Sequence, residues 1–493
     1  MEDFYTQFMA VKAAFDREAY EEALAILQKW PLAQLTNAQC LIYEDVMFTV
    51  LEKLGRLPEA LEHARRGLSV PVEATDLRHR KRALCSNWLL YLHYLPDVTD
   101  AQMFAAHQRY AGLFPGVRPF SWGAARAARA GKKKLRIGYI SPNFYEHIVT
   151  NFSVQLYAQY DRSRYEVILY QTGGQQNEVT DWLNGMVNGW RDLRKLTPKE
   201  AAARIAADEV DILVDLAGHT EGGHTLEIMA WKPAPVQVSG IGYFDTTGLP
   251  QMDYFLGDRY CDPPLQDRNF TEKILRLPHC HFCFTPKETV QQAKTTYQLH
   301  TPVVFGSFNN FRKLTPQQLA VWREIVRRVP GSHLLLRHTQ NEPARLAYVQ
   351  QLVDALDFPA GSVTVEPGIW HYLDHYQDVD IVLDTYPYPG GGTTCEALYM
   401  GVPVVSRYGT RHGSRFGLSL LTNVGLGELA AGTDEDYIRV AVALAQDPQL
   451  IVALHQQLRT LMQHSPLMDA RGYVRGVEAA YERIWRRWLR GRD

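Results

Sequence analysis

The sequence lacks the features that mark a membrane protein, a nucleic-acid-binding protein or a secreted protein. No uninterrupted apolar run is long enough to cross a bilayer, so the sequence predicts no membrane span. The formal net charge of -2 over 493 residues offers no basic surface for nucleic acid. The six cysteines fit a reducing compartment. The first five residues do not resemble a signal peptide, and we therefore expect a cytoplasmic protein.

Potential metal ligands cluster in one short segment, at His279, Cys280, His281 and Cys283. Strand alternation would direct successive side chains of this segment to opposite faces. No second pair of ligands lies at a zinc-finger spacing from it. We therefore expect these residues to be structural, and we expect no metal ion in the protein.

The first part of the chain has the composition of helices and contains two similar segments. Each segment places a large residue three positions before an alanine, Ala23 in one and Ala60 in the other. The alanines are separated by roughly the tetratricopeptide period of about 34 residues. This spacing predicts tetratricopeptide-like repeats over residues 1–75 and a helical connector over 76–131, with a plain helical bundle as the alternative. The helical region is also a candidate surface for self-association.

From residue 132 onward, short apolar strands alternate with helices, which is typical of doubly wound α/β domains. The pattern predicts two Rossmann-like domains, over residues 132–295 and 296–470, and a C-terminal helix over 471–493. Tandem domains of this kind suggest a nucleotide-sugar glycosyltransferase with its site in the interdomain cleft. The expected strands are 135–140, 165–170, 211–215, 235–239, 253–256, 303–307, 333–337, 362–365, 379–383 and 402–405.

The segment 379–406 is the most informative part of the sequence. A strand leads through a glycine-rich turn into a helix, whose free N–H groups and dipole favour an anion. Glu396, one turn into this helix, is placed to accept hydrogen bonds from a ribose. An ordinary βαβ crossover is the alternative. The segment predicts a nucleotide diphosphate at the carboxyl end of a parallel sheet, held by Gly391, Gly392, Thr393, Thr394 and Glu396.

Several motifs occur together in a fixed order, which is more specific than one glycine loop. They lie at 86–97, 135–147, 211–220, 233–238, 242–248, 308–313 and 379–406. Through them, the chain from Leu84 to Trp485 resembles the catalytic region of the O-linked N-acetylglucosamine transferase family and its bacterial, tetratricopeptide-bearing relatives. The resemblance implies an α/β fold of the GT-B type. It also implies inverting, metal-independent transfer of a sugar from a UDP donor to Ser or Thr of a protein.

The resemblance further implies roles for individual residues, and it implies no cofactor besides the UDP-sugar substrate. Lys313 would supply a cation to the diphosphate as UDP leaves. His147 matches a cleft histidine proposed as the catalytic base, and His219 would line the same cleft. Asn310 matches an amide near the diphosphate, and His371 matches a histidine that contacts the nucleotide.

The sequence departs from the family in the regions that contact the sugar and the acceptor. His224 stands where arginine is usual, and Phe244-Asp245 replaces a Pro-Gly pair. Gly392 stands where the animal enzymes have histidine. These departures leave the donor sugar and the acceptor open.

The leading hypothesis is transfer of N-acetylglucosamine from UDP-GlcNAc to Ser or Thr of a protein acceptor such as flagellin. One alternative is an N-glycosyltransferase that moves glucose from UDP-glucose to Asn of an adhesin. Another is a catalytically silent module whose helices recruit a partner. A hydrolase or epimerase of the same fold is the last, and we identify no residue set in the sequence for water activation.

Overall fold

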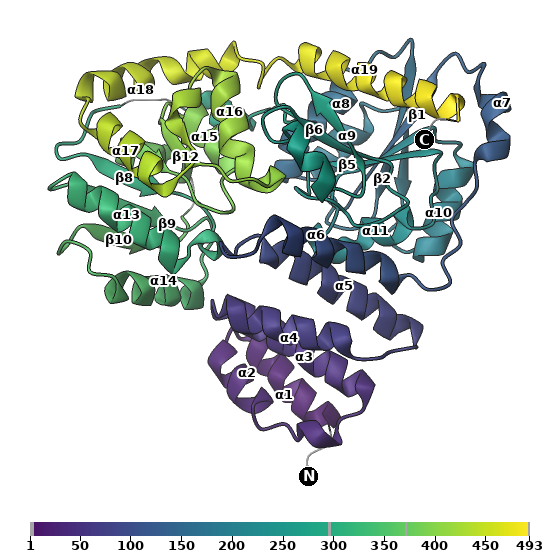
Figure 1. The fold of residues 1–493 in the computed structure, drawn as a ribbon, viewed down its shortest axis with the longest axis horizontal. Helices are drawn as coiled ribbons and strands as arrows, with labels where there is room; N and C mark the ends of the chain where they lie inside the picture. The colour runs from purple at the N-terminus through teal and green to yellow at the C-terminus, as the bar shows by residue number, and fades with distance from the viewer. Residues whose placement is uncertain (1–3, 294–296, 370–371, 492–493) are drawn as a thin grey trace.

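The computed structural model describes residues 4–293, 297–369 and 372–491. Two parallel sheets, each flanked by helices, stand beside each other, and a region of helices lies below them in the view of Figure 1. The architecture is therefore α/β with two doubly wound domains, as the sequence predicts.

The N-terminal region consists of antiparallel helices that pack in pairs, α1 with α2 and α3 with α4. Ala23 and Ala60 are fully buried, which allows close approach of the helices. Thr36 and Thr99 begin α3 and α6 with capping boxes that satisfy the free N–H groups of the first turn. The elements are α1 (Phe4–Asp16), α2 (Tyr20–Leu27), η1 (Leu32–Gln34), α3 (Asn37–Lys53), α4 (Leu57–Ser69), α5 (Thr75–Leu92), α6 (Asp100–Gln108) and η2 (Arg109–Leu113).

The first sheet is parallel throughout and has the order β3-β2-β1-β4-β5-β6-β7. Its central strands are buried along their whole length, which explains their continuous apolar runs. The strands are β1 (Leu135–Ser141), β2 (Tyr165–Gln171), β3 (Gly189–Asp192), β4 (Ile212–Asp215), β5 (Val236–Gly240), β6 (Tyr254–Asp258) and β7 (Lys273–Leu277). The helical elements of this part are η3 (Gly123–Ala125), α7 (Arg126–Arg129), α8 (Ile148–Ala158), α9 (Glu178–Asn184), α10 (Pro198–Ala207), η4 (Thr220–Gly223), α11 (His224–Met229) and η5 (Pro264–Asn269).

The second sheet is also parallel, with the order β10-β9-β8-β11-β12-β13. Both sheets reverse their strand order beside the first strand, and ligands of such folds bind at that switch point. The strands are β8 (Val304–Ser307), β9 (His333–Arg337), β10 (Val363–Glu366), β11 (Ile381–Leu383), β12 (Val404–Arg407) and β13 (Ala430–Ala431). The helical elements are α12 (Glu288–Gln292), η6 (Phe311–Lys313), α13 (Pro316–Arg328), α14 (Pro343–Ala355), η7 (Tyr372–Asp378), α15 (Gly392–Tyr399), η8 (His412–Arg415), α16 (Phe416–Val424), η9 (Gly427–Leu429), α17 (Asp434–Ala445) and α18 (Pro448–Gln463).

The last helix, α19 (Ala470–Leu489), returns from the second domain and covers the first sheet (Figure 1). The hydroxyls of Tyr481 and Tyr139 lie 3.3 Å apart, and Glu478 accepts a hydrogen bond of 2.8 Å from the backbone N–H of Asp161. Since α19 contributes a buried face to the first domain, the two domains share one C-terminal segment.

Every strand that the sequence predicts is present, within two residues at most ends. Three short strands were not predicted, namely β3, β7 and β13. β3 and β7 lie at the edges of the first sheet and are partly exposed. β13 has only two residues. Such strands carry too little apolar pattern to be recognised from sequence.

The helical region contacts the second domain through a buried ion-pair cluster. Glu52 of α3 pairs with Arg345 of α14 at 2.8 Å and also with Arg312 of η6. Glu52 is 5 % exposed, so the two guanidinium groups compensate a carboxylate that is almost out of water. Since Arg312 precedes Lys313, the helical region directly supports the loop that carries this lysine.

In the described ranges, no single helix is long and apolar enough to cross a membrane. The bent pair α17 and α18, with 92° between the two helices, meets the length and composition criteria only when taken together.

Candidate active site in the interdomain cleft

A cavity of about 500 Å³ lies between the two α/β domains. The first domain contributes the loops that follow β1 and β5 together with the start of α8, and the second contributes η6 and the start of α15. These are the carboxyl ends of parallel strands, where such folds bind ligands. The lining residues include Glu146, His147, Ile148, Gly242, Phe244, Lys287, Lys313, Gln340, Tyr372, Tyr388, Gly391, Gly392, Thr393, Glu396 and Phe416.

Lys313 reaches the cavity from η6 and contacts residues 389–392, which we call the glycine loop. Its ammonium donates to the backbone carbonyl of Pro389 at 2.8 Å and to Oδ1 of Asn309 at 3.0 Å. The same group lies 4.5 Å from the ring centroid of Tyr388. Loss of water around the ammonium lowers the pKa of Lys313 to about 8, although the nearby Asp384 carboxylate opposes the shift. An anion in the cavity would therefore meet a cation that is poorly compensated by the protein.

Asp384 orders the backbone and side chains around this lysine. It follows β11 and is fully buried, and its Oδ1 accepts from the N–H groups of Gly390 at 2.7 Å and Thr385 at 2.9 Å. Its Oδ2 accepts from the hydroxyl of Ser406 at 2.8 Å. Asn309 donates to the same carboxylate at 3.3 Å. One buried carboxylate thus links β8, β11 and β12 at the end of the sheet.

The glycine loop is packed too tightly for side chains at two of its positions. A Cβ on Gly390 would lie 2.5 Å or less from the hydroxyl oxygens of Thr393 and Thr394. Thr393 also donates to Oδ1 of Asn309 at 3.0 Å. A Cβ on Gly392, the first residue of α15, would lie 2.3 Å from Cδ1 of Ile148 on the opposite domain. The loop therefore brings backbone N–H groups to the cavity and touches the other domain at Gly392.

The contact between Gly392 and Ile148 leads to a first prediction. Gly392→Ala should turn the end of the Ile148 side chain into the cavity and weaken donor binding by about three- to tenfold, because the overlapping atoms are the flexible end of a side chain that lines the same cavity. Ile148→Ala removes the overlapping atoms, so the double variant should recover most of the donor affinity. Isothermal titration calorimetry with UDP on the wild type, the two single variants and the double variant tests this prediction. Equal loss in the single and double variants would contradict the contact.

Glu396 lies on the cavity wall one turn into α15. It is 5 % exposed and forms a hydrogen bond with the hydroxyl of Tyr372. Burial raises the pKa of Glu396 to about 7, while Tyr372 and the ammonium of Lys287 oppose the rise. Hydroxyl groups of a ribose would donate to the carboxylate and stabilise its charged form.

Two opposite titrations predict that donor affinity is greatest between about pH 7 and 8. A bound diphosphate stabilises protonated Lys313, whose pKa is lowered to about 8, so affinity should fall as pH rises above this value. A bound ribose stabilises ionised Glu396, whose pKa is raised to about 7, so affinity should also fall below this value. Each limb has a limiting slope of about tenfold per pH unit. Calorimetry with a UDP-sugar should show both limbs, with the alkaline limb absent in Lys313→Ala and the acid limb absent in Glu396→Gln. A flat profile in the unmodified protein would contradict both assignments.

His147 lines the cavity at the N-cap of α8. Its Nδ1 accepts a hydrogen bond from the N–H of Val149 at 3.2 Å, and burial lowers its pKa to about 4. The neutral ring therefore carries its proton on Nε2, which makes that atom a donor. Action as a general base would require the ring to give up its contact with Val149.

None of the other predicted residues that the structure describes lines the cavity. His219 is fully buried, and it donates from Nε2 to the carbonyl of Thr247 while Nδ1 accepts from Ser86, both at 2.9 Å. Asn310 caps η6 through the N–H of Arg312. None of His219, Asn310 and Thr394 is among the described residues that line the cavity. His371 falls outside the residues that the structure describes.

Sequence reasoning missed Asn309 and Asp384, which hold Lys313 and the glycine loop. It also missed the aromatic wall of Phe244, Tyr388 and Phe416, in which the ring centroids of the first two lie 4.5 Å apart. Asp384 directly follows the buried strand β11. A carboxylate at the carboxyl end of a parallel strand is a signal by which it could have been found in the sequence. Spacing does not determine whether Asn309 or Asn310 contacts Lys313, because this depends on the direction of a single turn. In the structure Asn309 makes the contact.

Comparisons with known proteins agree with this architecture. The sequence profile of glycosyl transferase family 41 matches residues 117–287 and 283–477. The "probable UDP-N-acetylglucosamine--peptide N-acetylglucosaminyltransferase SPINDLY" of Oryza sativa subsp. japonica is 37% identical over 417 residues, which cover 82% of this chain and 44% of the relative. The corresponding protein named SEC from Arabidopsis thaliana is 29% identical over 405 residues, which cover 78% of this chain and 41% of the relative.

A solved structure of a mutant of the O-GlcNAc transferase of Thermobaculum terrenum is similar over almost the whole chain. The TM-score is 0.82 at 28% identity, with 96% of this chain and 89% of that one covered. The chain spans less than half the length of the plant relatives. The profile match and the identity to the rice protein show that the chain belongs to glycosyl transferase family 41.

Proposed function

We propose that this protein is a metal-independent, inverting glycosyltransferase that moves N-acetylglucosamine from UDP-GlcNAc to Ser or Thr of a protein. The observation that carries the proposal is the meeting of Lys313, the glycine loop and Glu396 on one wall of the interdomain cavity. Relatives named as UDP-N-acetylglucosamine–peptide transferases support the donor and the acceptor class.

The reaction is a displacement at the anomeric carbon of the sugar. The acceptor hydroxyl oxygen forms a new bond to the anomeric carbon. The bond from this carbon to the β-phosphate oxygen breaks at the same time, and UDP leaves with the electron pair. Negative charge then grows on the diphosphate. Lys313 and the N–H groups at the start of α15 stabilise this charge at the moment it develops.

The proton of the acceptor hydroxyl must also leave. His147 is the proposed catalytic histidine of the cleft. In the present tautomer its Nε2 carries a proton, so this atom donates a hydrogen bond and does not accept the proton. We propose that His147 donates a hydrogen bond from Nε2 that orients the acceptor, and that a phosphate oxygen of the donor takes the hydroxyl proton and carries it away with UDP.

The donor set of the cavity supports a mechanism without a metal. Potential metal-ligand groups do exist among the described residues, but none of them lies in the wall of the cavity. The cation of Lys313 supplies the charge that a divalent ion supplies in other transferases.

Mass spectrometry of acceptor proteins tests the proposal. The purified protein is incubated with UDP-GlcNAc or UDP-glucose and with proteins of its own host, and modified peptides are sequenced. We expect N-acetylhexosamine on Ser or Thr. Hexose on Asn would replace the proposal with N-glucosylation. Failure to release UDP from any donor, with the fold intact, would favour a binding module.

A further inference from the structure

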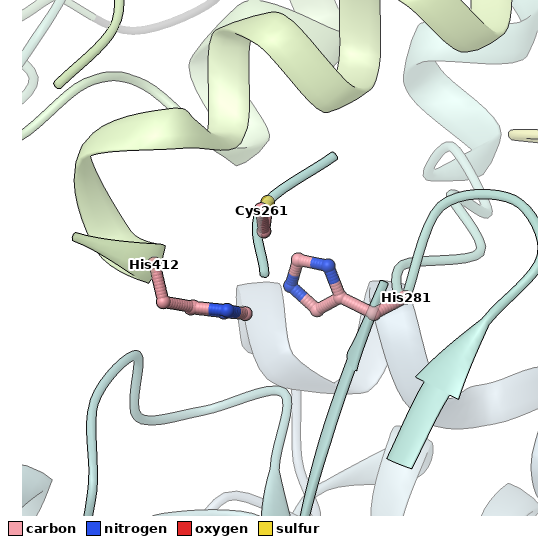
Figure 2. A group of neighbouring side chains, drawn as sticks. All are labelled: Cys261, His281 and His412. Atoms are coloured by element: carbon pink, nitrogen blue, oxygen red, sulfur yellow. The ribbon is translucent and has the colours of Figure 1, made fainter. Parts of the chain in front are cut away.

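A second cluster of reactive side chains lies at the interface of the two domains, outside the cavity. Cys261 follows β6 and His281 follows β7, whereas His412 begins η8 in the second domain. One ligand atom from each lies within 4.8 Å of the other two, and none of the three residues is more than 2 % exposed. In Figure 2 the ring of His281 points toward His412, with the Cys261 thiol beside the gap between them.

A carboxylate orients each of the two imidazole rings. Nδ1 of His281 donates to Asp258 at 2.6 Å, and Nδ1 of His412 donates to Asp262 at 2.9 Å. With Nδ1 protonated, Nε2 of each ring presents a lone pair. Carboxylates hold metal-binding histidines in this way, because the bond fixes the tautomer and makes the second nitrogen a stronger ligand.

Asp258 is itself fixed, as the outer shell of a metal site requires. Its Oδ1 accepts from the N–H groups of Tyr260 and Cys261, each at 2.8 Å, and its Oδ2 accepts from the hydroxyl of Ser419 at 2.8 Å. Ser419 belongs to the second domain, so the network joins both domains. The rings of Phe255 and Phe416 pack against His412 and shield the cluster from bulk solvent.

One atom of this cluster is left unsatisfied by the polypeptide. Nε2 of His281 is buried and has no hydrogen-bond partner among the described residues. An unpaired buried polar atom is costly, and native proteins rarely keep one without a reason. A purely structural cluster of hydrogen bonds does not account for this lone pair, whereas a bound metal ion does.

We propose that Cys261, His281 and His412 bind a Zn²⁺ ion that fastens the two domains to each other. One thiolate and two imidazoles suit zinc among the common divalent ions, with water as the fourth ligand. Cys261, whose thiol now donates to the carbonyl of Arg415 at 3.6 Å, loses its proton to the solvent when the ion binds. The inference does not depend on the proposed glycosyl transfer.

This site differs from the one that the sequence analysis considered and set aside. Of the segment 279–283, only His281 contributes a ligand, and the other two ligands come from distant parts of the chain. Strand alternation opposes a site built within the segment 279–283, but it places no limit on ligands that come from distant segments.

Metal analysis of the purified full-length protein tests the proposal. We expect about one zinc ion per chain by elemental mass spectrometry, because the cluster offers one set of three ligands. Cys261→Ser and His412→Gln should each lose at least nine-tenths of this zinc. His79→Gln is the matched control, because His79 belongs to another His/Glu group on the surface and should not affect the content. Loss of the zinc in His79→Gln would overturn the proposal. A zinc content of less than one-tenth of an ion per chain in the wild type after supplementation with Zn²⁺ would also overturn it.

Cobalt tests for a thiolate ligand in the wild-type protein, so this measurement does not depend on the folding of any variant. The wild-type protein loaded with Co²⁺ should show a thiolate-to-cobalt charge-transfer band and the visible bands of a four-coordinate ion. Absence of the thiolate band in the wild type overturns the proposal without any variant. Cys280→Ser should keep the band and Cys261→Ser should lose it, with circular dichroism as the check of folding. The reverse pattern would assign the ligand to Cys280 and also overturn it.

Discussion

Replacement of Lys313 by alanine should lower kcat for sugar transfer by about 10²–10³-fold, the usual cost of removing one group that stabilises developing charge. Its ammonium contacts the glycine loop through Pro389, lies over Tyr388 and belongs to the wall of the cavity in which we expect the diphosphate. The KM for the donor should change less than kcat, because the charge on the phosphate grows as the bond breaks. Release of UDP, measured with a coupled assay, gives both constants.

A matched variant separates this effect from loss of structure. Lys81 of α5 donates to the backbone carbonyl of Val70 and lies in the helical region. Lys81→Ala should therefore keep kcat within about twofold, as expected of a substitution away from the site. Transfer by Lys313→Ala at near-normal rates, with unchanged circular dichroism, would remove this lysine from the mechanism.

Replacement of Asp384 by alanine should destabilise the second domain by at least about 3 kcal/mol, since each buried donor left without a partner costs about 1–3 kcal/mol. The carboxylate accepts from Gly390, Thr385, Ser406 and Asn309, and all of these groups are shielded from water. The glycine loop should then lose its fixed shape and the protein should lose donor binding. Denaturant unfolding and calorimetry measure the two effects.

The size of the effect should follow the number of partners that are lost. Ser406→Ala removes a single hydrogen bond to the carboxylate and should cost only about 1 kcal/mol. Asp357, whose side chain is 89% exposed, provides the surface control, and its alanine variant should unfold like the wild type. Equal stability of Asp384→Ala and Asp357→Ala would contradict the role of the buried carboxylate.

Much of the fold could be predicted because parallel sheets buried on both faces leave long apolar runs in the sequence. The edge strands β3 and β7 escaped notice for the same reason, since they are only partly covered. The path of α19 was also beyond prediction. Its amphipathic pattern indicates a helix, but nothing local indicates that Tyr481 meets Tyr139 in the other domain.

The local pattern predicted only the part of the site that lies in one continuous segment, whereas Lys313 and His147, which line the cavity from other segments, were predicted through the family resemblance. Gly391, Gly392, Thr393 and Glu396 stand within a few residues of each other, and all of them line the cavity. Contacts between distant segments were invisible, and the tight fit of Gly392 against Ile148 is the clearest example. The pattern of the segment 379–406 gives no indication that Ile148 on the opposite wall lies next to Gly392.

The central claim is that the interdomain cavity binds the UDP part of a sugar donor. Isothermal titration calorimetry with UDP, GDP and ADP, on the wild type and on Lys313→Ala, tests it most directly. We predict one UDP per chain, weaker binding of GDP and ADP, and at least about tenfold weaker UDP binding in the variant, consistent with loss of a charge-assisted contact. Binding of GDP or ADP as tight as that of UDP, or UDP binding that does not change in Lys313→Ala, would contradict the claim.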